Sequence, residues 1–379
     1  MKRFLFKLAS SAALTLGGLE AALWLFHPLP VFPQEWSSMY EQNLPGLKKK
    51  VLYERNRHGF RFLSAPRAMP QAKPAGTVRV FCLGASPTDQ PTQNAEDAWW
   101  GVLETRLNAA VAGGARVEIL SRGRGGETAA DTLRWARAAL LPYSPDAVVI
   151  LQGINDLCWN GGPHYRYPRE EQTSELTERD WGGYPRWKRA LRLVSQTYRH
   201  ISELRNRRRI REAIRAGAAL EWHSGALPEL RRLYQSRPLQ AELKRDPDPI
   251  VEFGDSMQAL LQLLREHHVP AIVCAQPVLW KSGMTEEARA RLWMSVATPS
   301  GFARAAPAWL EAEMARYNAV QRQVAERAGA LFVDLPGRIP ATDDLFMDDC
   351  HFTDEGSRRV AAEILPALKD ALGKRLRTR

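Results

Sequence analysis

The chain has 379 residues, enough for one large domain carrying an insertion. Its hydrophobic content of 45% and charged content of 25% exclude a wholly disordered protein. The net charge of +11 is concentrated between Arg186 and Arg215, where eleven Lys or Arg residues stand against two Asp or Glu. A basic protein that binds nucleic acid through its general charge is therefore not indicated.

The first 28 residues predict a signal anchor. Basic residues occur up to Lys7, and a mostly apolar run follows from Leu8 to Phe26. About 20 apolar residues span a bilayer, and basic residues before the run favour an inside amino terminus. Bulky residues end the run where a cleavage site needs small ones, so we expect an uncleaved anchor. Glu20 counts against deep burial, and an amphipathic helix packed on the domain is the alternative.

Residues 29–75 are rich in proline and lysine, which is typical of a neck with little regular structure. Within it, Asn56 to Arg61 is a candidate ordered patch. With the amino terminus inside, the chain after the apolar run lies on the outer side of the membrane. We therefore expect an exported protein on the periplasmic or extracellular face.

Apolar strands alternate with helical patterns over residues 76–159 and 246–379. The expected strands are residues 78–83, 117–120, 146–151, 271–275 and 330–334. Runs that are apolar throughout are typical of buried parallel strands, so the pattern predicts an α/β domain with a parallel sheet covered by helices on both faces.

Residues 160–245 interrupt this alternation with a polar, Trp-rich and Arg-rich stretch, which predicts a mainly helical basic insertion. One apolar stripe at helical spacing contains Leu191, Val194, Tyr198, Ile201 and Leu204, and the other face carries Arg205, Arg207, Arg208, Arg209 and Arg211. Such a face is either a solvated helix surface or a contact for anionic membrane headgroups or an acidic polymer. No nucleic-acid-binding motif accompanies the charge, so no nucleic acid partner is expected.

Three candidate catalytic residues lie in loops beside the expected strands. Ser86 follows the first strand and is the candidate nucleophile, although a serine after glycine is often only turn chemistry. His351 is the candidate general base. Asp348, three residues earlier, can hold the imidazole in the tautomer that accepts a proton, and Asp349 is the alternative partner.

Candidate oxyanion donors follow the next two strands. They are Gly126 and Asn155, and the backbone N–H of Ser86, after the first strand, is a third candidate donor. Gly125 and Gly126 also suit a tight turn, and Asp156 suits a cap of the following turn. Because loops at the carboxyl ends of parallel strands meet at one edge of a sheet, these residues are expected to converge.

The four cysteines form no CxxC pair and no Cys/His cluster with zinc spacing, so no metal is expected. Free, buried thiols are the simplest interpretation. Cys158 and Cys350 flank the proposed site loops, so a disulfide between them is an open alternative in an exported domain. Trp159, Trp280 and Trp293 stand in or near these loops, where indole rings pack or stack on sugars.

Four short blocks in this order resemble those of the SGNH (GDSL-type) serine hydrolase superfamily. They are Gly84-Ala85-Ser86-Pro87-Thr88, Gly123-Arg124-Gly125-Gly126-Glu127-Thr128, Gly153-Ile154-Asn155-Asp156 and Asp348-Asp349-Cys350-His351. The resemblance covers about residues 76–159 and 246–372. Ala85 stands where the family has aspartate, and Pro87 is a second departure.

The resemblance implies a three-layer flavodoxin-like fold with a five-stranded parallel sheet, Ser86, Asp348 and His351 as triad, and Ser86, Gly126 and Asn155 as oxyanion donors. It also implies ester hydrolysis or acyl transfer without a cofactor. A membrane-anchored esterase or deacetylase acting on envelope glycan or lipid is the first hypothesis. An O-acyltransferase with the same triad and a non-catalytic envelope binding or assembly protein are the alternatives. The oligomeric state is not predicted.

Overall fold

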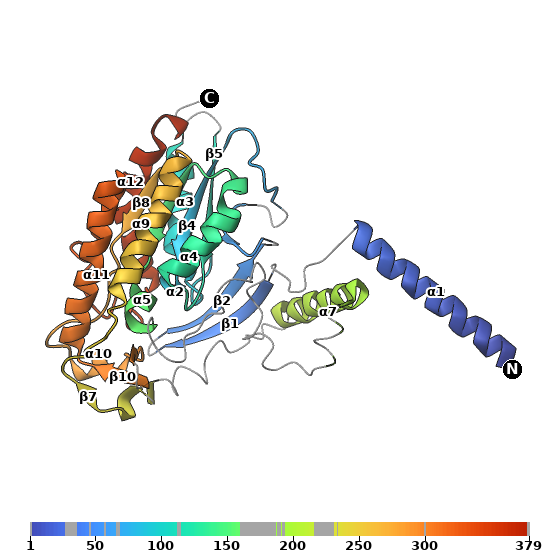
Figure 1. The fold of residues 1–379 in the computed structure, drawn as a ribbon, viewed down its shortest axis with the longest axis horizontal. Helices are drawn as coiled ribbons and strands as arrows, with labels where there is room; N and C mark the ends of the chain where they lie inside the picture. The colour runs from blue at the N-terminus through green and yellow to red at the C-terminus, as the bar shows by residue number, and fades with distance from the viewer. Residues whose placement is uncertain are drawn as a thin grey trace.

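A six-stranded sheet forms the centre of the fold in the computed structural model (Figure 1). The structure describes residues 2–26, 36–44, 47–56, 58–65, 69–111, 115–159, 187, 191, 194–215, 231–232, 234–298 and 301–376. The sheet contains β3 (Arg61–Phe62), β4 (Thr77–Gly84), β5 (Arg116–Gly123), β6 (Ala147–Leu151), β8 (Ala271–Cys274) and β11 (Leu331–Val333), in the order β11-β8-β6-β4-β5-β3. Five strands are parallel and lie where the sequence predicts them.

The predicted strand number of five was too low, because β3 adds a sixth strand that runs antiparallel to β5. Arg61 pairs with Ser121 and Phe62 pairs with Leu120. The neighbouring Phe60 explains why this segment joins the sheet. Its ring is 1% exposed and packs edge-on against Phe81 at 5.2 Å.

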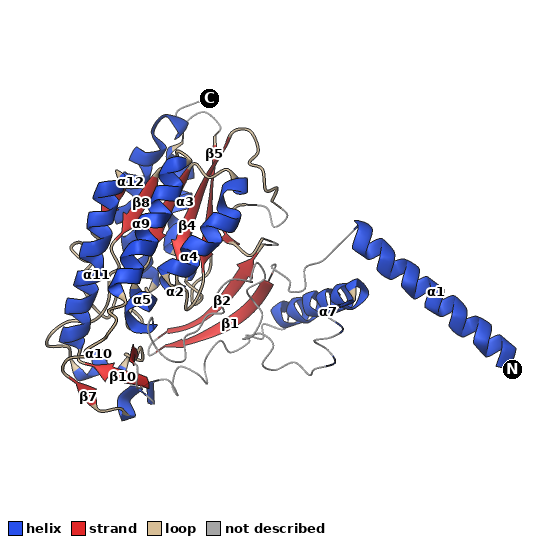
Figure 2. Ribbon diagram, in the orientation of Figure 1, coloured by secondary structure: helices blue, strands red, loops and turns tan. Residues whose placement is uncertain are grey.

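Helices cover both faces of the sheet (Figure 2). Helices α3 (Trp99–Ala110) and α12 (Asp354–Leu372) pack together, while α9 (Ile250–Glu266) packs against both α4 (Ala129–Trp135) and α11 (Pro307–Ala328). In α12 the buried residues Val360, Ile364 and Leu368 recur every four positions, so one stripe of the helix faces the core. The layers agree with the expected three-layer α/β fold.

Short elements complete the chain. They are α2 (Ser86–Asp89), α5 (Ile154–Trp159), α10 (Glu286–Ala290), the single-turn helices η1 (Ala136–Leu140), η2 (Leu141–Tyr143) and η3 (Gly373–Leu376), and a small sheet of β7 (Leu239–Gln240), β10 (Gly301–Ala305) and β9 (Val296–Thr298). The order of the central sheet reverses between β4 and β6. Loops after these strands therefore open toward one crevice, which is where sites form in such sheets.

The neck is more ordered than the sequence predicts. Strands β1 (Trp36–Leu44) and β2 (Leu47–Arg55) form an antiparallel hairpin, and β3 follows. Val51, Tyr53 and Arg55 of β2 are buried, whereas Leu52 between them is exposed. This period of two is that of a strand with one face against the protein.

The amino-terminal helix α1 (Lys2–Phe26) contacts α7 (Gln196–Arg215), a helix within the predicted basic insertion. The Glu20 carboxylate accepts the Ser195 hydroxyl at 3.0 Å and the backbone N–H groups of Thr197, at 2.8 Å, and of Gln196. Glu20 therefore caps the start of α7. Residues 160–186 and 216–230 of the insertion lie outside the described residues.

Across the described part of the chain, no helix combines the length and the apolar character needed to cross a membrane. The predicted signal anchor over residues 1–28 is therefore unconfirmed.

Candidate active site

Ser86 is held at a sharp turn where β4 ends. Gly84 has φ +155°, and a Cβ at this position would lie 2.1 Å from the Leu151 carbonyl oxygen, so only glycine fits. Ala85 is extended, and Ser86 then begins the single-turn helix α2. Ser86 is half-buried while the rest of α2 is buried, so Ser86 is the residue of this turn that a ligand can reach.

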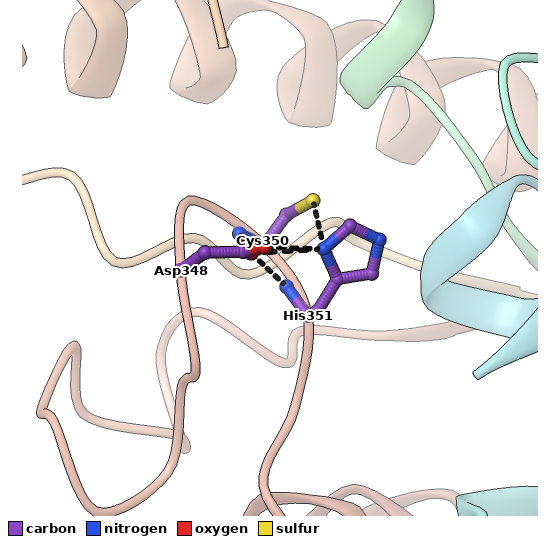
Figure 3. A group of neighbouring side chains, drawn as sticks. All are labelled: Asp348, Cys350 and His351. Carbon is purple, nitrogen blue, oxygen red and sulfur yellow. Dashed lines mark hydrogen bonds and ion pairs between the residues drawn. The ribbon is translucent and has the colours of Figure 1, made fainter. Parts of the chain in front are cut away.

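Asp348 and His351 form a buried pair in the loop before α12 (Figure 3). His351 Nδ1 lies 2.9 Å from both Asp348 carboxylate oxygens. The carboxylate also accepts the backbone N–H groups of His351 and Cys350, at 3.0 and 3.1 Å. The loop therefore fixes both the orientation of the imidazole and its tautomer, with Nδ1 carrying the proton.

The pair stabilises its own charges. Burial alone would raise the pKa of Asp348, but the charge and hydrogen bond of His351 hold that pKa below its usual range. Burial likewise would lower the pKa of His351, and the Asp348 carboxylate raises it instead. His351 is thereby a stronger base than an isolated imidazole.

Asp349 contacts a different part of the protein. Its carboxylate accepts the Trp280 indole N–H at 2.8 Å and the backbone N–H groups of Trp293 and Met294 at 2.9 and 3.3 Å. Burial and the neighbouring Asp348 raise its pKa to about 6. The carboxylate that reaches His351 is thus Asp348, and Asp349 ties the segment around residues 280–294 to the site loop.

Trp293 supports the Asp348–His351 pair directly. Its indole Nε1–H donates to Asp348 at 2.9 Å, and its ring lies parallel to the His351 ring with centroids 6.4 Å apart. Trp280 is only 1% exposed and bonds to Asp349 beside the pair, so of the two alternatives for this ring it packs and does not stack on a sugar. The Trp159 side chain lies outside the described residues.

The second ring nitrogen, His351 Nε2, is buried and has no hydrogen-bond partner among the described residues. The Ser86 hydroxyl therefore does not donate to it in this structure. The two segments are nevertheless packed together, because Gln93 donates to the Phe352 carbonyl at 3.3 Å and accepts the Ser357 hydroxyl at 2.7 Å. Catalytic hydrogen bonds are often long in the free enzyme and tighten with substrate.

The glycine loop after β5 lies beside the serine. A Cβ on Gly125 would be 4.0 Å from the Ser86 Cβ, and Gly126 has φ +86°. Asn155, which is 1% exposed, donates one amide hydrogen to the Glu127 carbonyl at 2.9 Å. Its second amide hydrogen is left for another acceptor. Asn155 thus joins the loop after β6 to the loop after β5, and the oxyanion role of these groups stays a prediction.

Asp156 caps α4 rather than the turn that follows it. It accepts the Ala129 backbone N–H at 2.9 Å and the Gln152 amide at 3.4 Å. Burial raises its pKa to about 7. Asp156 therefore fastens the loop after β6 to the start of α4.

All four cysteines are buried and free, so no disulfide joins Cys158 to Cys350. Asp348, Cys350 and His351 offer potential metal-ligand atoms within 4.8 Å of one another. The fit to a metal is poor, because Nδ1 is already bonded to Asp348 and burial raises the pKa of the Cys350 thiol well above its usual value.

The sequence missed the residues that support the serine turn from the neck. Tyr53, Arg55 and Arg61 all bond to α2 or to the residues just after it, and Asp89 of α2 is their main partner. The only signal was the ordered patch expected between Asn56 and Arg61, and it did not identify their partner.

A three-layer α/β fold with these loops at the carboxyl ends of its strands is that of the SGNH-type ester hydrolases. The chain belongs to the GDSL-like Lipase/Acylhydrolase family, whose model matches residues 82–359. No curated protein matches the chain.

Among solved structures, several hydrolases align with most of the chain at low sequence identity. The acetyl xylan esterase AlAXEase is 14% identical, with coverage of 77% of this chain and 100% of that chain and a TM-score of 0.41. The lipase/acylhydrolase from Enterococcus faecalis is 13% identical, with 77% and 96% coverage and a TM-score of 0.42. LAE5, an alpha/beta hydrolase from the metagenome of Lake Arreo, Spain, is 15% identical, with 78% and 95% coverage and a TM-score of 0.42.

Proposed function

We propose that the protein is a serine esterase that uses Ser86, His351 and Asp348 as its catalytic triad. His351 Nε2 takes the proton of the Ser86 hydroxyl, whose oxygen attacks the ester carbonyl carbon. The negative oxygen is held by the Ser86 N–H, the Gly126 N–H and the Asn155 amide. The alcohol leaves with the proton from His351, and water then attacks the acyl-enzyme to release the acid.

The buried Asp348–His351 pair carries this proposal. An imidazole whose Nδ1 is fixed by a carboxylate and whose Nε2 has no partner is ready to accept a proton at Nε2. The segment that carries Ser86 is packed against the segment that carries His351 through Gln93. Family membership supports an ester hydrolase and disfavours the non-catalytic alternative.

The substrate and the cellular location are the less direct part of the proposal. We propose an ester on an envelope glycan or lipid, cleaved by an exported enzyme attached to the membrane through residues 1–28. Basic residues up to Lys7, followed by a mostly apolar run from Leu8 to Phe26, support export. Cell fractionation with and without a carbonate wash tests attachment, and recovery of all the protein in the cytoplasmic fraction would contradict it.

The function is tested with purified protein on short-chain aryl esters and acetylated polysaccharides. We expect a fluorophosphonate to label Ser86 and Ser86→Ala to abolish labelling and hydrolysis. Ser282→Ala, a change at an exposed serine that has no part in the proposed triad, is the matched control and should leave both unchanged. A Ser86→Ala protein with full activity would refute the triad.

The acyltransferase alternative shares every step up to the acyl-enzyme. It differs only in the acceptor, so adding a soluble sugar or glycerol to the same assay separates the two. Product analysis that finds the acyl group mainly on the added hydroxyl, at acceptor concentrations far below that of water, would favour transfer over hydrolysis.

A further inference from the structure

Arg55, at the end of β2, has an unusually complete set of partners for a buried cation. Its side chain is 4% exposed. Nη2 donates to the Asp89 carboxylate at 2.7 Å and to the Gly123 carbonyl at 2.9 Å, Nη1 donates to the Gly59 carbonyl at 2.7 Å, and Nε donates to the Tyr53 hydroxyl at 2.6 Å. The planar guanidinium thus joins several chain segments at fixed angles.

Two of these partners belong to the site loops. Asp89 is the last residue of α2, the single turn that begins with Ser86, and Gly123 is the residue at which the glycine loop leaves β5. The two segments touch directly, since a Cβ on Gly123 would lie 2.1 Å from the Asp89 backbone nitrogen. Arg55 therefore holds the serine turn and the oxyanion loop to each other through one side chain.

Two further residues of the neck reinforce the same turn. The Tyr53 hydroxyl lies 3.0 Å from both Asp89 carboxylate oxygens. Arg61 donates to the carbonyl oxygens of Asp89 and Gln90, each at 2.5 Å, and of Gln93 at 2.7 Å. We call Tyr53, Arg55 and Arg61 the neck clamp.

The neck clamp also reaches the histidine loop. Gln93, held by Arg61, is the residue that bonds to Phe352 and Ser357 on either side of the start of α12. The charge of Asp89 also acts on His351. Burial lowers the pKa of His351 and the Asp348 carboxylate raises it, and the negative charge of Asp89 contributes to the increase. Residues that precede the family match, which begins at residue 82, therefore fasten the serine turn to the oxyanion loop. They reach the histidine loop indirectly, through Gln93.

We propose that Arg55 is a positioning residue of the esterase, which sets the Ser86 turn against the oxyanion loop and so makes the neck part of the catalytic domain. This inference rests on the proposed function. A displacement of about 1 Å at a reacting group can cost about 100-fold in rate. Without Arg55 the Asp89 carboxylate is left buried beside Tyr53, and the turn can shift toward solvent.

The test compares Arg55→Gln with Arg79→Gln in the full chain. Arg79 is the matched control, because it is fully buried and bonds to the Glu118 carboxylate and to the carbonyls of Gln71 and Tyr143. It lies five residues before Gly84 in β4, about 16 Å along the strand from the serine turn. Both variants lose one buried ion pair, but only Arg55→Gln loses contacts to the site.

For folded Arg55→Gln we expect kcat on an aryl ester to fall about 10- to 100-fold with KM within about twofold. Labelling of Ser86 by the fluorophosphonate should slow to the same degree. The acid limb of the kcat/KM profile should move to higher pH, because the Asp89 charge then acts on His351 without Arg55. Arg55→Lys should be intermediate, and it serves as the test variant where Arg55→Gln does not fold.

Arg79→Gln should lower the melting temperature while leaving kcat, the labelling rate and the acid limb of the folded protein unchanged. Arg55 variants that match Arg79→Gln in these three readouts would overturn the positioning role and leave only a structural one. A wild-type protein that the probe does not label at Ser86 would instead refute the proposed function, and with it the inference.

Discussion

Two adjacent carboxylates in the loop before α12 differ in their partners, and this difference decides which of them can act on the imidazole. Asp348 accepts the ring N–H of His351, whereas Asp349 accepts N–H groups of the segment that contains Trp280 and Trp293. Burial would raise the pKa of both carboxylates. The pKa of Asp348 is lowered because its partner His351 can become cationic, whereas burial and the neighbouring charge of Asp348 raise the pKa of Asp349.

This arrangement predicts different effects of the same chemical change at the two positions. In Asp348→Asn the amide oxygen can still accept the backbone N–H groups, which turns the NH2 group toward Nδ1 as a donor. His351 then loses its productive tautomer, and kcat should fall about 10³- to 10⁴-fold. Asp349→Asn leaves that bond intact and should lower kcat less than about tenfold while lowering the melting temperature. Steady-state kinetics and thermal unfolding of both variants measure this. Equal losses of kcat in folded proteins would be inconsistent with the assignment.

Asp156 allows a prediction on stability against pH. Burial raises its folded pKa from 3.8 to about 7, so between these values the folded state binds a proton that the unfolded state has released. Stability must then fall as pH rises through this window, by about 2–4 kcal/mol at most. Asp156→Asn removes this titration, so the variant should gain relative to wild type between pH 4 and pH 8. Urea unfolding at pH 4 and pH 8 measures the free energy of unfolding of both proteins. If the difference between variant and wild type is the same at the two pH values, the pKa of Asp156 is not raised.

At the scale of elements, the parallel strands could be predicted because a strand buried on both faces is apolar throughout, as in residues 147–151. Strand β2 escaped prediction because its buried face, Val51, Tyr53 and Arg55, includes a charged residue. Buried residues do alternate with more exposed ones along β2. From sequence alone, however, a position is predicted to be buried only if its residue is apolar. A buried arginine is recognised only once its partner is known.

The same reason explains how much of the site could be predicted. Ser86, Asp348 and His351 stand in short blocks whose residue types state their chemistry, and the structure brings Asp348 and His351 into contact. The pairing of Arg55 with Asp89 joins residues 34 positions apart, with no local pattern to mark it. Long-range polar contacts follow from the folded topology and not from spacing along the chain.

The close approach of β4 and β6 gives an element-scale prediction. Gly84→Ala places a Cβ 2.1 Å from the Leu151 carbonyl oxygen and 2.4 Å from Thr88 Oγ1, so either the strands separate or the serine turn moves. Gly76→Ala is the matched control, because Gly76 also has positive φ but no atom within 4 Å of a Cβ. The control should cost about 1–2 kcal/mol of folding free energy, the strain of the backbone alone.

We expect Gly84→Ala to cost clearly more than the control and to slow fluorophosphonate labelling of the protein that remains folded. Chemical denaturation and labelling kinetics on both variants provide the comparison. If the two substitutions cost the same and label at the same rate, β4 and β6 do not approach as closely as described.

At the scale of the whole molecule, the amino-terminal region serves two different parts of the protein. Helix α1 contacts α7, where Glu20 caps the helix and Arg199 lies over the Trp24 ring at 5.1 Å. Most hydrogen bonds of the neck clamp side chains, in contrast, lead to the α2 segment and to Gly123 at the start of the oxyanion loop. We therefore predict that the functional boundary of the catalytic domain lies before Tyr53, although the family match begins at residue 82.

Two truncations locate that boundary. Removal of residues 2–35 deletes α1 and its contacts to α7 but keeps the hairpin and the neck clamp, so kcat on a soluble aryl ester should stay within about threefold of wild type. Removal of residues 2–62 also deletes Tyr53, Arg55 and Arg61, which leaves Asp89 buried without its ion-pair partner and removes strand β3. Breaking a buried ion pair costs about 3–5 kcal/mol, so this protein should unfold at lower temperature and hydrolyse the ester at least about tenfold more slowly. Activity measured on the folded fraction, with unfolding followed in parallel, separates the loss of stability from the loss of catalysis.

Equal kcat values for the two truncated proteins would place the boundary after the neck. If the protein that lacks only residues 2–35 is already inactive, the boundary lies before the β1–β2 hairpin.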